Sequence, residues 1–229
     1  DNVFWPIIFG GKFEENGQVT PDNPANVAAI DYQAQFYKKF GVEAMNKFKS
    51  GMGKAKTPQD PLLTGQIAMQ IGWEYDYPEE RTEDGPVGVA PFPYPADHPE
   101  LEGSGMVSPR SLFIPKNAKH PEEAWEFMKY LLSEEQQVEF CYDTKVIPTV
   151  KSALDSQKLR DKYPTMVEFY EAAKSENLKG FPNSKYINEY LQSLTEETEL
   201  VLQGKQSAAE AMKKVKEKIQ PLADKASAK

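Results

Sequence analysis

Cysteine, histidine and long apolar runs are scarce in this chain of 229 residues. Its single cysteine, Cys141, excludes an intramolecular disulfide. The two histidines, His98 and His120, lie far apart, and neither stands at metal-ligand spacing with Cys141. We therefore expect no metal site and no cofactor. No apolar run approaches the roughly 20 residues of a membrane-spanning helix.

Positive charge is also in deficit, since the formal net charge is −8. A protein that binds the phosphate backbone of nucleic acids carries a basic surface, so this balance argues against a nucleic-acid partner. Lysines do gather near the end of the chain, but they alternate with apolar residues, which indicates a solvated helix face. The hydrophobic fraction of 39% is enough for one large domain or two small ones.

Motifs for phosphate binding and nucleophilic catalysis are incomplete. A phosphate loop over residues 48–55 would need glycine in place of Phe48 and serine or threonine in place of Ala55. The glycines within residues 103–108 do not form a dinucleotide fingerprint, because Ser108 stands at the third glycine position. The chain has no G-x-S-x-G sequence, so the nucleophile elbow of an α/β-hydrolase is excluded.

What the chain does have is an aromatic and acidic stretch within residues 58–78. Pro58 suits the first position of a short helix, which we expect over residues 58–63. Gly65 suits the left-handed residue that ends such a helix. Apolar residues then alternate with small or polar ones, which predicts a strand over residues 67–71.

Five aromatic and acidic residues follow this predicted strand: Trp73, Glu74, Tyr75, Asp76 and Tyr77. The end of a strand is where α/β proteins place their ligands. Ring faces beside carboxylates suit a sugar, which offers a C–H face to the rings and hydroxyl groups to the acceptors. Glu74 and Asp76 could also be the catalytic pair of a glycoside hydrolase, a mechanism that depends on the separation of the two carboxylates.

Elsewhere the first half of the chain mixes short strands with helices, and the second half is nearly all helical. Asn16 and Gly17 predict a hairpin turn. Capping residues and apolar periodicity predict helices over residues 24–40, 43–50, 121–132 and 187–203, with further helices after Ser133 and Ser207 and a bend or end at Pro221. Further strands are expected over residues 87–91 and 111–115. This pattern is typical of an α/β fold.

Five stretches recur in a fixed order along the chain: LLTGQIAMQIGW, VGVAPFP, SLFIPKNAKHPEEAWEFMKYLLSEEQQ, VIPTVKSAL and GKQSAAEAMKKVKEKI. Together they resemble the extracellular solute-binding proteins of ABC importers, of the large type that includes maltose-binding protein. That family runs a G-x-x-A-M strand into a tryptophan and later has a P-E-x-A-W-x-F helix. Each stretch alone is weak, but five in the family's order form a fairly specific pattern.

The resemblance implies the type II periplasmic-binding-protein fold, in which two α/β lobes close around a ligand by a hinge motion. It covers the second half of such a protein, so most of the N-terminal lobe would precede Asp1. By this analogy residues 1–106 and 149–229 form the C-terminal lobe, which is incomplete at its start. Residues 107–148 would be an excursion into the N-terminal lobe.

The resemblance also implies a set of cleft residues. Trp73 stands at the family's cleft tryptophan, and Tyr75 at a second aromatic position. At the crossing between lobes, where the family has two small residues, this chain has Ser108 and Pro109 followed by Arg110, which could bind a hydroxyl or an anion. The implied ligand-binding set is Trp73, Glu74, Tyr75, Asp76, Ser108, Arg110, Trp5 and Tyr186. By helical periodicity we expect Trp125 and Tyr190 to have packing roles.

The function that the resemblance implies is a non-enzymatic, extracytoplasmic binding component of an ABC importer. We expect a monomer that binds a sugar or oligosaccharide and delivers it to a membrane permease, in the periplasm or anchored by lipid at the outer face of the membrane. Three alternatives stay open at this point. The protein could be a carbohydrate-active hydrolase domain, a helical interaction module, or a binding protein for an anionic or amine solute.

Overall fold

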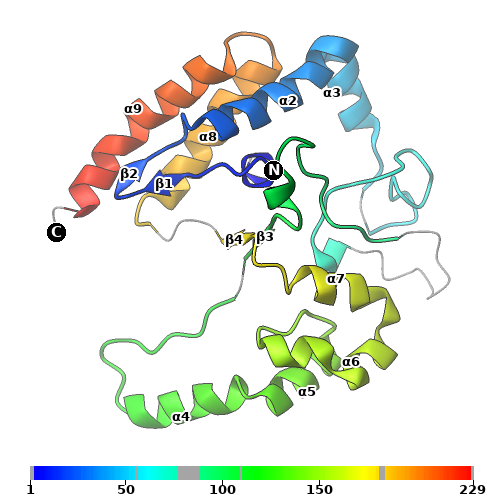
Figure 1. Ribbon diagram of the computed structural model, residues 1–229, viewed down its shortest axis with the longest axis vertical. Helices are drawn as coiled ribbons and strands as arrows, with labels where there is room; N and C mark the ends of the chain where they lie inside the picture. Colours follow the sequence, from blue (N-terminus) through cyan, green and yellow to red (C-terminus); the bar gives the residue numbers. More distant parts are fainter. Residues whose placement is uncertain (1–2, 55, 77–87, 109, 181–183, 228–229) are drawn as a thin grey trace. The chain divides into compact units, whose positions relative to one another are not determined.

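The computed structural model describes residues 3–54, 56–76, 88–108, 110–180 and 184–227, and of Asp76 it describes only the backbone (Figure 1). These residues form two compact units, each assembled from separate segments of the chain. Unit 1 comprises residues 1–51, 91–107 and 177–229, and unit 2 comprises residues 52–90 and 108–176. The units are defined by contacts within this chain, and the limits of the two lobes stay a prediction.

Unit 1 begins with helix α1 (Phe4–Ile8) and a hairpin of β1 (Glu14–Glu15) and β2 (Gln18–Val19). The two strands are antiparallel, with Glu14 opposite Val19. The turn residues Asn16 and Gly17 have φ angles of 53° and 77°. Two consecutive positive φ angles fit the type I′ turn that joins twisted strands, so the predicted hairpin is confirmed.

Helix α2 (Pro24–Phe40) forms as its capping residues predict. The Asn23 side chain accepts a hydrogen bond of 2.9 Å from the Ala25 N–H, which satisfies one of the free donors of the first turn. Gly41 ends the helix with a φ of 87°, and its N–H donates to the Tyr37 carbonyl. Helix α3 (Val42–Gly51) follows directly and confirms the predicted second helix.

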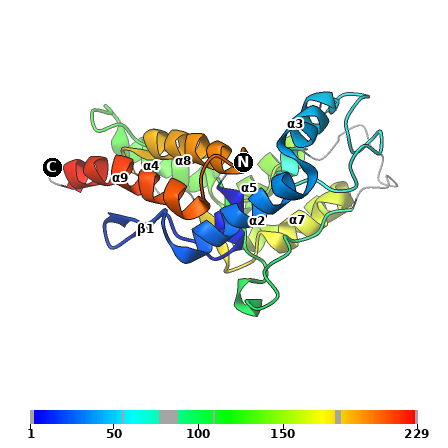
Figure 2. The same cartoon turned by 90° about the horizontal axis from the view of Figure 1, so that it is seen from above.

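The core of unit 1 lies mainly between helices α2, α8 (Ile187–Leu202) and α9 (Ala208–Ser227). Helices α8 and α9 lie side by side in both views (Figures 1 and 2). Ser207 and Glu210 form the capping box that their spacing predicts, since Ser207 N–H donates to Glu210 Oε2 and Glu210 N–H donates to Ser207 Oγ. The same pattern at Ser133 and Gln136 predicts a capping box for α5 (Glu134–Thr144), but the Ser133 side chain makes no capping hydrogen bond. Helix α9 does not end at Pro221 but continues to Ser227.

A short parallel pair of strands joins distant parts of the chain in unit 1. Strand β3 (Gly105–Val107) pairs with β4 (Leu178–Gly180), and Gly105 lies opposite Leu178. Before β3, the turn η2 (Pro99–Leu101) is tied to the same region, because the Asn177 side chain donates to the carbonyls of Glu100 and Glu102 at 2.8 Å each.

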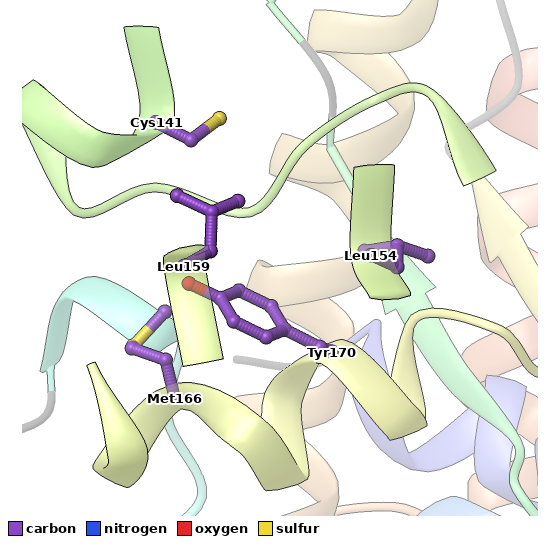
Figure 3. Packing of buried hydrophobic residues seen from close by; sticks show 5 residues of the cluster. All are labelled: Cys141, Leu154, Leu159, Met166 and Tyr170. Carbon is purple, nitrogen blue, oxygen red and sulfur yellow. The ribbon is translucent and has the colours of Figure 1, made fainter. Parts of the chain in front are cut away.

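Unit 2 is built from short helices: α4 (Pro121–Leu131), α5 (Glu134–Thr144), η3 (Lys151–Asp155), α6 (Gln157–Lys162), η4 (Pro164–Met166) and α7 (Val167–Ala172). Its core is a cluster of five buried side chains, one each from α5, η3, α6, η4 and α7: Cys141, Leu154, Leu159, Met166 and Tyr170. Figure 3 shows Leu159, Met166 and Tyr170 close together within this cluster. The helices predicted over residues 121–132 and after Ser133 are therefore confirmed.

The secondary structure predicted around residue 65 is wrong in part. Residues 58–63 form turns rather than a helix, because the Asp60 carboxylate accepts the N–H groups of Lys56 and Leu62 at 2.9 Å each. Such local side-chain bonds compete with helix formation. Gly65 does adopt the expected left-handed conformation, with a φ of 71°.

The predicted strands over residues 67–71 and 111–115 are also absent. The described residues include no strand partner beside either segment, and an extended segment without a partner forms no ladder. Of the strand expected over 87–91, residue 87 lies outside the described residues, and 88–91 are not a strand.

Helix α4 has several exposed aromatic side chains. We expected Trp125 to pack, but it is 48% exposed, and no residue of α4 is buried. Phe127 and Tyr130 are more exposed still, and Phe113, which precedes the helix, is 81% exposed. The amphipathic pattern thus predicted the helix correctly, but within the described part of the chain nothing buries its apolar side.

Alkaline pH is expected to destabilise unit 2. Burial raises the pKa of the Cys141 thiol to about 11 and the pKa of the Tyr170 phenol to about 12. Because both values exceed the ordinary ones, the contribution of the neutral groups to stability is complete below about pH 9 and is lost as the pH rises towards 11–12. Urea unfolding followed by Cys141 accessibility to a thiol reagent should show this loss between pH 8 and pH 11.

The matched variant is Cys141→Ala, which should flatten the lower part of that pH dependence because one titrating group is removed. Cys141 that reacts at pH 8 in the folded protein as fast as in the denatured chain would contradict the burial of this cluster.

Candidate functional site

The most prominent candidate site is a pair of aromatic rings in unit 2. Trp73 precedes the turn η1 (Glu74–Asp76), and Tyr75 lies within it. The two ring planes are inclined by only 10° and their centroids are 6.1 Å apart. Since stacked carbon atoms touch at about 3.5 Å, this separation implies a lateral offset of about 5 Å. The rings therefore overlap little and form a stepped surface.

This stepped surface is accessible, and a glutamate stands between its two aromatic residues in the sequence. Tyr75 is 57% exposed, and Trp73 and Glu74 are partly exposed. The side chain of Asp76 lies outside the described residues. Chemically, ring faces bind the C–H face of a ligand, and a carboxylate such as that of Glu74 accepts hydrogen bonds from hydroxyl or amine groups.

A tight loop over residues 52–66 lies beside the aromatic pair. The Lys56 ammonium is 5.3 Å from the centre of the Tyr75 ring, within the range of a cation–π contact. Gly53 packs so closely on this loop that a Cβ atom there would be 1.7 Å from the Gln59 carbonyl oxygen. Sequence reasoning missed Lys56, because the contact depends on the loop conformation and not on a spacing.

Gly53→Ala is accordingly expected to distort this loop and displace Lys56 from Tyr75. The Gln59 carbonyl is backbone and cannot rotate away like a side chain, so the loop itself must shift. Gly88→Ala is the matched control, because a Cβ at that glycine would meet nothing within 4 Å. Hydrogen exchange over residues 52–66 should increase in the first variant only; unchanged protection there would contradict this packing.

Trp5 belongs to a separate row of aromatic rings in unit 1. It is partly exposed on α1, and its ring lies 5.2 Å from that of Tyr32 on α2. Tyr32 in turn contacts Phe9 at 5.5 Å and Phe36 at 5.3 Å. Sequence reasoning did not find the partners of Trp5, although Tyr32 and Phe36 stand one helical turn apart on α2.

Tyr186 and Tyr190 are both buried in unit 1. The Tyr186 hydroxyl donates to Glu14 Oε2 at 2.9 Å, and burial together with this carboxylate raises the pKa of the phenol. Tyr190 is only 1% exposed, and its hydroxyl donates to the Phe13 carbonyl at 2.8 Å. Tyr190 therefore has the packing role expected from its sequence period.

The residues of the predicted crossing follow strand β3. Ser108 and Arg110 are exposed members of unit 2, while Pro109 lies outside the described residues. The structure thus places Trp73, Glu74 and Tyr75 together on one segment, Ser108 and Arg110 on another segment of the same unit, and Trp5 and Tyr186 in unit 1.

The described residues contain neither a metal-binding cluster nor a helix that could span a membrane. No group of three or more histidine, cysteine, aspartate or glutamate side chains is arranged to hold a metal ion in that part of the chain. Over the same residues, none of the helices combines the length and the apolar character needed to cross a membrane.

Comparison with known families decides the class of protein. The model of the family described as bacterial extracellular solute-binding protein matches residues 3–166, which is more than half of the chain. The chain belongs to this family. The resemblance seen in the sequence motifs is confirmed, and the family's members are binding proteins rather than enzymes.

Solved structures with the same fold include three proteins crystallised or named with saccharides. This solute-binding protein is 22% identical to CpMnBP1 with mannotriose bound, with a TM-score of 0.73 over 94% of this chain and 56% of that one. It is 16% identical to the cyclic alpha-maltosyl-1,6-maltose binding protein from Arthrobacter globiformis (TM-score 0.62; 96% and 54% covered). Maltose-bound T. maritima MalE3 gives 22% identity (TM-score 0.61; 97% and 56% covered).

These likenesses confirm the predicted fold class, a helix-rich α/β part of the type II periplasmic-binding-protein fold. The solute-binding protein spans about half the length of the solved structures that it matches. Comparison with curated proteins gives no match.

Proposed function

We propose that this solute-binding protein binds a sugar or oligosaccharide and is the binding component of an ABC importer. The observation that carries the proposal is the accessible, offset pair of Trp73 and Tyr75, with Glu74 between them in the sequence. Sugars bind to such surfaces because their C–H faces pack on rings while their hydroxyl groups need acceptors. The saccharides named in the three similar structures support the same ligand class.

In the proposed mechanism, the Trp73–Tyr75 pair forms one wall of a cleft between two lobes. The ligand's ring packs on this wall, and Glu74 and Asp76 accept hydrogen bonds from its hydroxyl groups. Ser108, Arg110, Trp5 and Tyr186 are the further proposed contacts; of these, Tyr186 would need a change in its bond to Glu14 to reach a ligand. The ligand shifts the protein to its closed form by binding that form more tightly.

We further propose that residues 1–106 and 149–229 belong to the C-terminal lobe and residues 107–148 to the N-terminal lobe. The support is that α4 keeps large apolar side chains exposed, among them Trp125 and Phe127 on opposite flanks of the helix. Exposed apolar surface of this kind is normally covered, and the remaining part of a two-lobed fold would cover it. Hydrogen exchange should then show α4 exchanging faster than α8 and α9; equal protection of all three would contradict this division.

We also propose the protein's partner and its location in the cell. The closed protein presents its ligand to a membrane permease, as a monomer, in the periplasm or anchored by lipid at the outer face of the cell membrane. It is not an enzyme. Release of reducing ends from an oligosaccharide that disappears in the Glu74→Gln variant would contradict this and favour a hydrolase that uses Glu74 and Asp76.

Thermal unfolding with a saccharide panel tests the ligand class. Mannotriose, maltose and unrelated amino compounds are added at increasing concentration. A ligand at about one hundred times its Kd stabilises by about 2.7 kcal/mol, which for a chain of this size raises Tm by about 5–10 °C. We expect this rise with at least one saccharide, its loss in Tyr75→Ala, and its persistence in Tyr130→Ala, which changes an exposed tyrosine of α4. Stabilisation by amino compounds alone would contradict the proposal.

A further inference from the structure

The loop over residues 52–66 holds a lysine above the proposed sugar platform. The Lys56 ammonium lies 5.3 Å from the centre of the Tyr75 ring, and Tyr75 is stacked with Trp73. The ring contact orients the ammonium but leaves its three N–H donors available for other partners. Neither an ion pair nor a side-chain hydrogen bond joins the Lys56 ammonium to any other described residue.

A hydrogen bond to the backbone of Lys56 helps to fix the position of this residue. Its φ angle is 59°, a left-handed conformation that a lysine adopts only when its surroundings enforce it. The enforcing group is Asp60, which is fully buried and accepts the Lys56 N–H through Oδ2 and the Leu62 N–H through Oδ1. The side chain of Lys56 therefore starts from a fixed point beside Tyr75, unlike an ordinary surface lysine.

From this arrangement we infer that the site selects a saccharide that carries a carboxylate, namely a uronic-acid oligosaccharide. The inference rests on the proposed sugar-binding function and narrows its substrate class. The C–H face of the sugar packs on the stepped Trp73–Tyr75 surface, and its carboxylate accepts a charge-assisted hydrogen bond from the Lys56 ammonium. Glu74 accepts bonds from the hydroxyl groups and repels a carboxylate, so the acidic substituent binds at Lys56.

Paired ligands test this selection on the complete chain. Isothermal titration at low salt compares mannotriose with the mannuronate trisaccharide of the same linkage, so the two ligands differ only in their carboxylates. We expect the uronate to bind about tenfold more tightly, because charge-assisted hydrogen bonds are stronger than neutral ones. The advantage should shrink at high salt, since an exposed charge pair is screened.

Lys56→Met is the decisive variant, because methionine keeps an apolar chain on the ring but removes the charge. The uronate advantage should fall to about onefold, while the affinity for mannotriose stays within about twofold. Lys119→Met is the matched control, since Lys119 is an exposed lysine of the same unit outside the 52–66 loop. Circular dichroism of each variant confirms an unchanged fold.

The outcomes separate this inference from the proposed function. A neutral trisaccharide that binds as tightly as the uronate, or an advantage that survives Lys56→Met, overturns the uronate assignment and leaves sugar binding in place. Binding of neither ligand overturns both. Equal gains from a mannose phosphate and from the mannuronate would show a general anion preference and likewise overturn the assignment to uronates.

Discussion

Trp73→Ala should lower saccharide affinity by about tenfold to a hundredfold. A tryptophan that packs on a ligand buries about 150–250 Å² and is the residue type most often found to dominate binding energy. The change removes one of the two stacked rings and leaves Tyr75 without the ring beside it. Isothermal titration with the saccharide that gives the largest thermal stabilisation measures this loss directly.

Trp125→Ala provides the matched control for this prediction. Trp125 is also in unit 2 and is more exposed than Trp73, but it lies on α4 rather than on the stepped surface. Its removal should leave the affinity within about twofold. Equal losses in the two variants, or no loss in Trp73→Ala, would remove Trp73 from the site.

Tyr190→Ala should destabilise unit 1 by about 3–5 kcal/mol, the range for removing a large buried aromatic side chain. Tyr190 is fully buried on α8, its ring meets that of Phe13 edge to face with centroids 6.0 Å apart, and its hydroxyl donates to the Phe13 carbonyl. It therefore links α8 to the segment before the hairpin. Urea unfolding followed by far-ultraviolet circular dichroism measures the change.

Tyr190→Phe separates the two contributions of this residue. The ring stays, and the Phe13 carbonyl loses the phenol but keeps the Thr20 N–H as a donor at 2.9 Å, so the expected cost is about 0.5–1.5 kcal/mol. Tyr94→Ala, at an exposed tyrosine of the same unit, should change the free energy of unfolding by about 0.5 kcal/mol or less. A cost for Tyr190→Ala no larger than that of Tyr94→Ala would contradict the assigned core.

The helices were predictable because their determinants are local. Asn23, Gly41 and the Ser207–Glu210 box lie within a few residues of the helix ends that they define. Apart from the β1–β2 hairpin, which its turn residues predicted, the strands were not predictable, because a strand needs a partner that can lie anywhere in the chain. Strand β3 pairs with β4 across more than seventy residues, and neither was predicted.

The candidate site was likewise predictable only where its residues are neighbours in the sequence. Trp73, Glu74 and Tyr75 are adjacent in sequence, so their grouping was visible as a cluster of aromatic and acidic residues. Lys56 lies near Tyr75 because residues 58–63 form turns rather than the predicted helix, and in these turns the Asp60 carboxylate accepts the Lys56 N–H. Asp60 is buried, and its side-chain hydrogen bonds therefore compete with helix formation; the local sequence pattern does not indicate this burial.

The surroundings of Trp5 and Tyr186 could not be predicted from the sequence either. Both are aromatic residues that periodicity alone could assign to a core or to a site. Trp5 lies in a partly exposed aromatic row, whereas Tyr186 is 7% exposed and bonded to Glu14. These differences arise from packing between α1, α2 and the β1–β2 hairpin.

The most direct test of saccharide binding at Trp73 uses its own fluorescence. The chain has three tryptophans, so Trp5→Phe combined with Trp125→Phe leaves Trp73 as the sole emitter. Titration with mannotriose and with its mannuronate counterpart should give a saturable change in the intensity and wavelength of Trp73 emission, with the Kd found by calorimetry. Emission that stays constant while calorimetry records saturable binding would contradict the account, because the ligand would then bind away from Trp73.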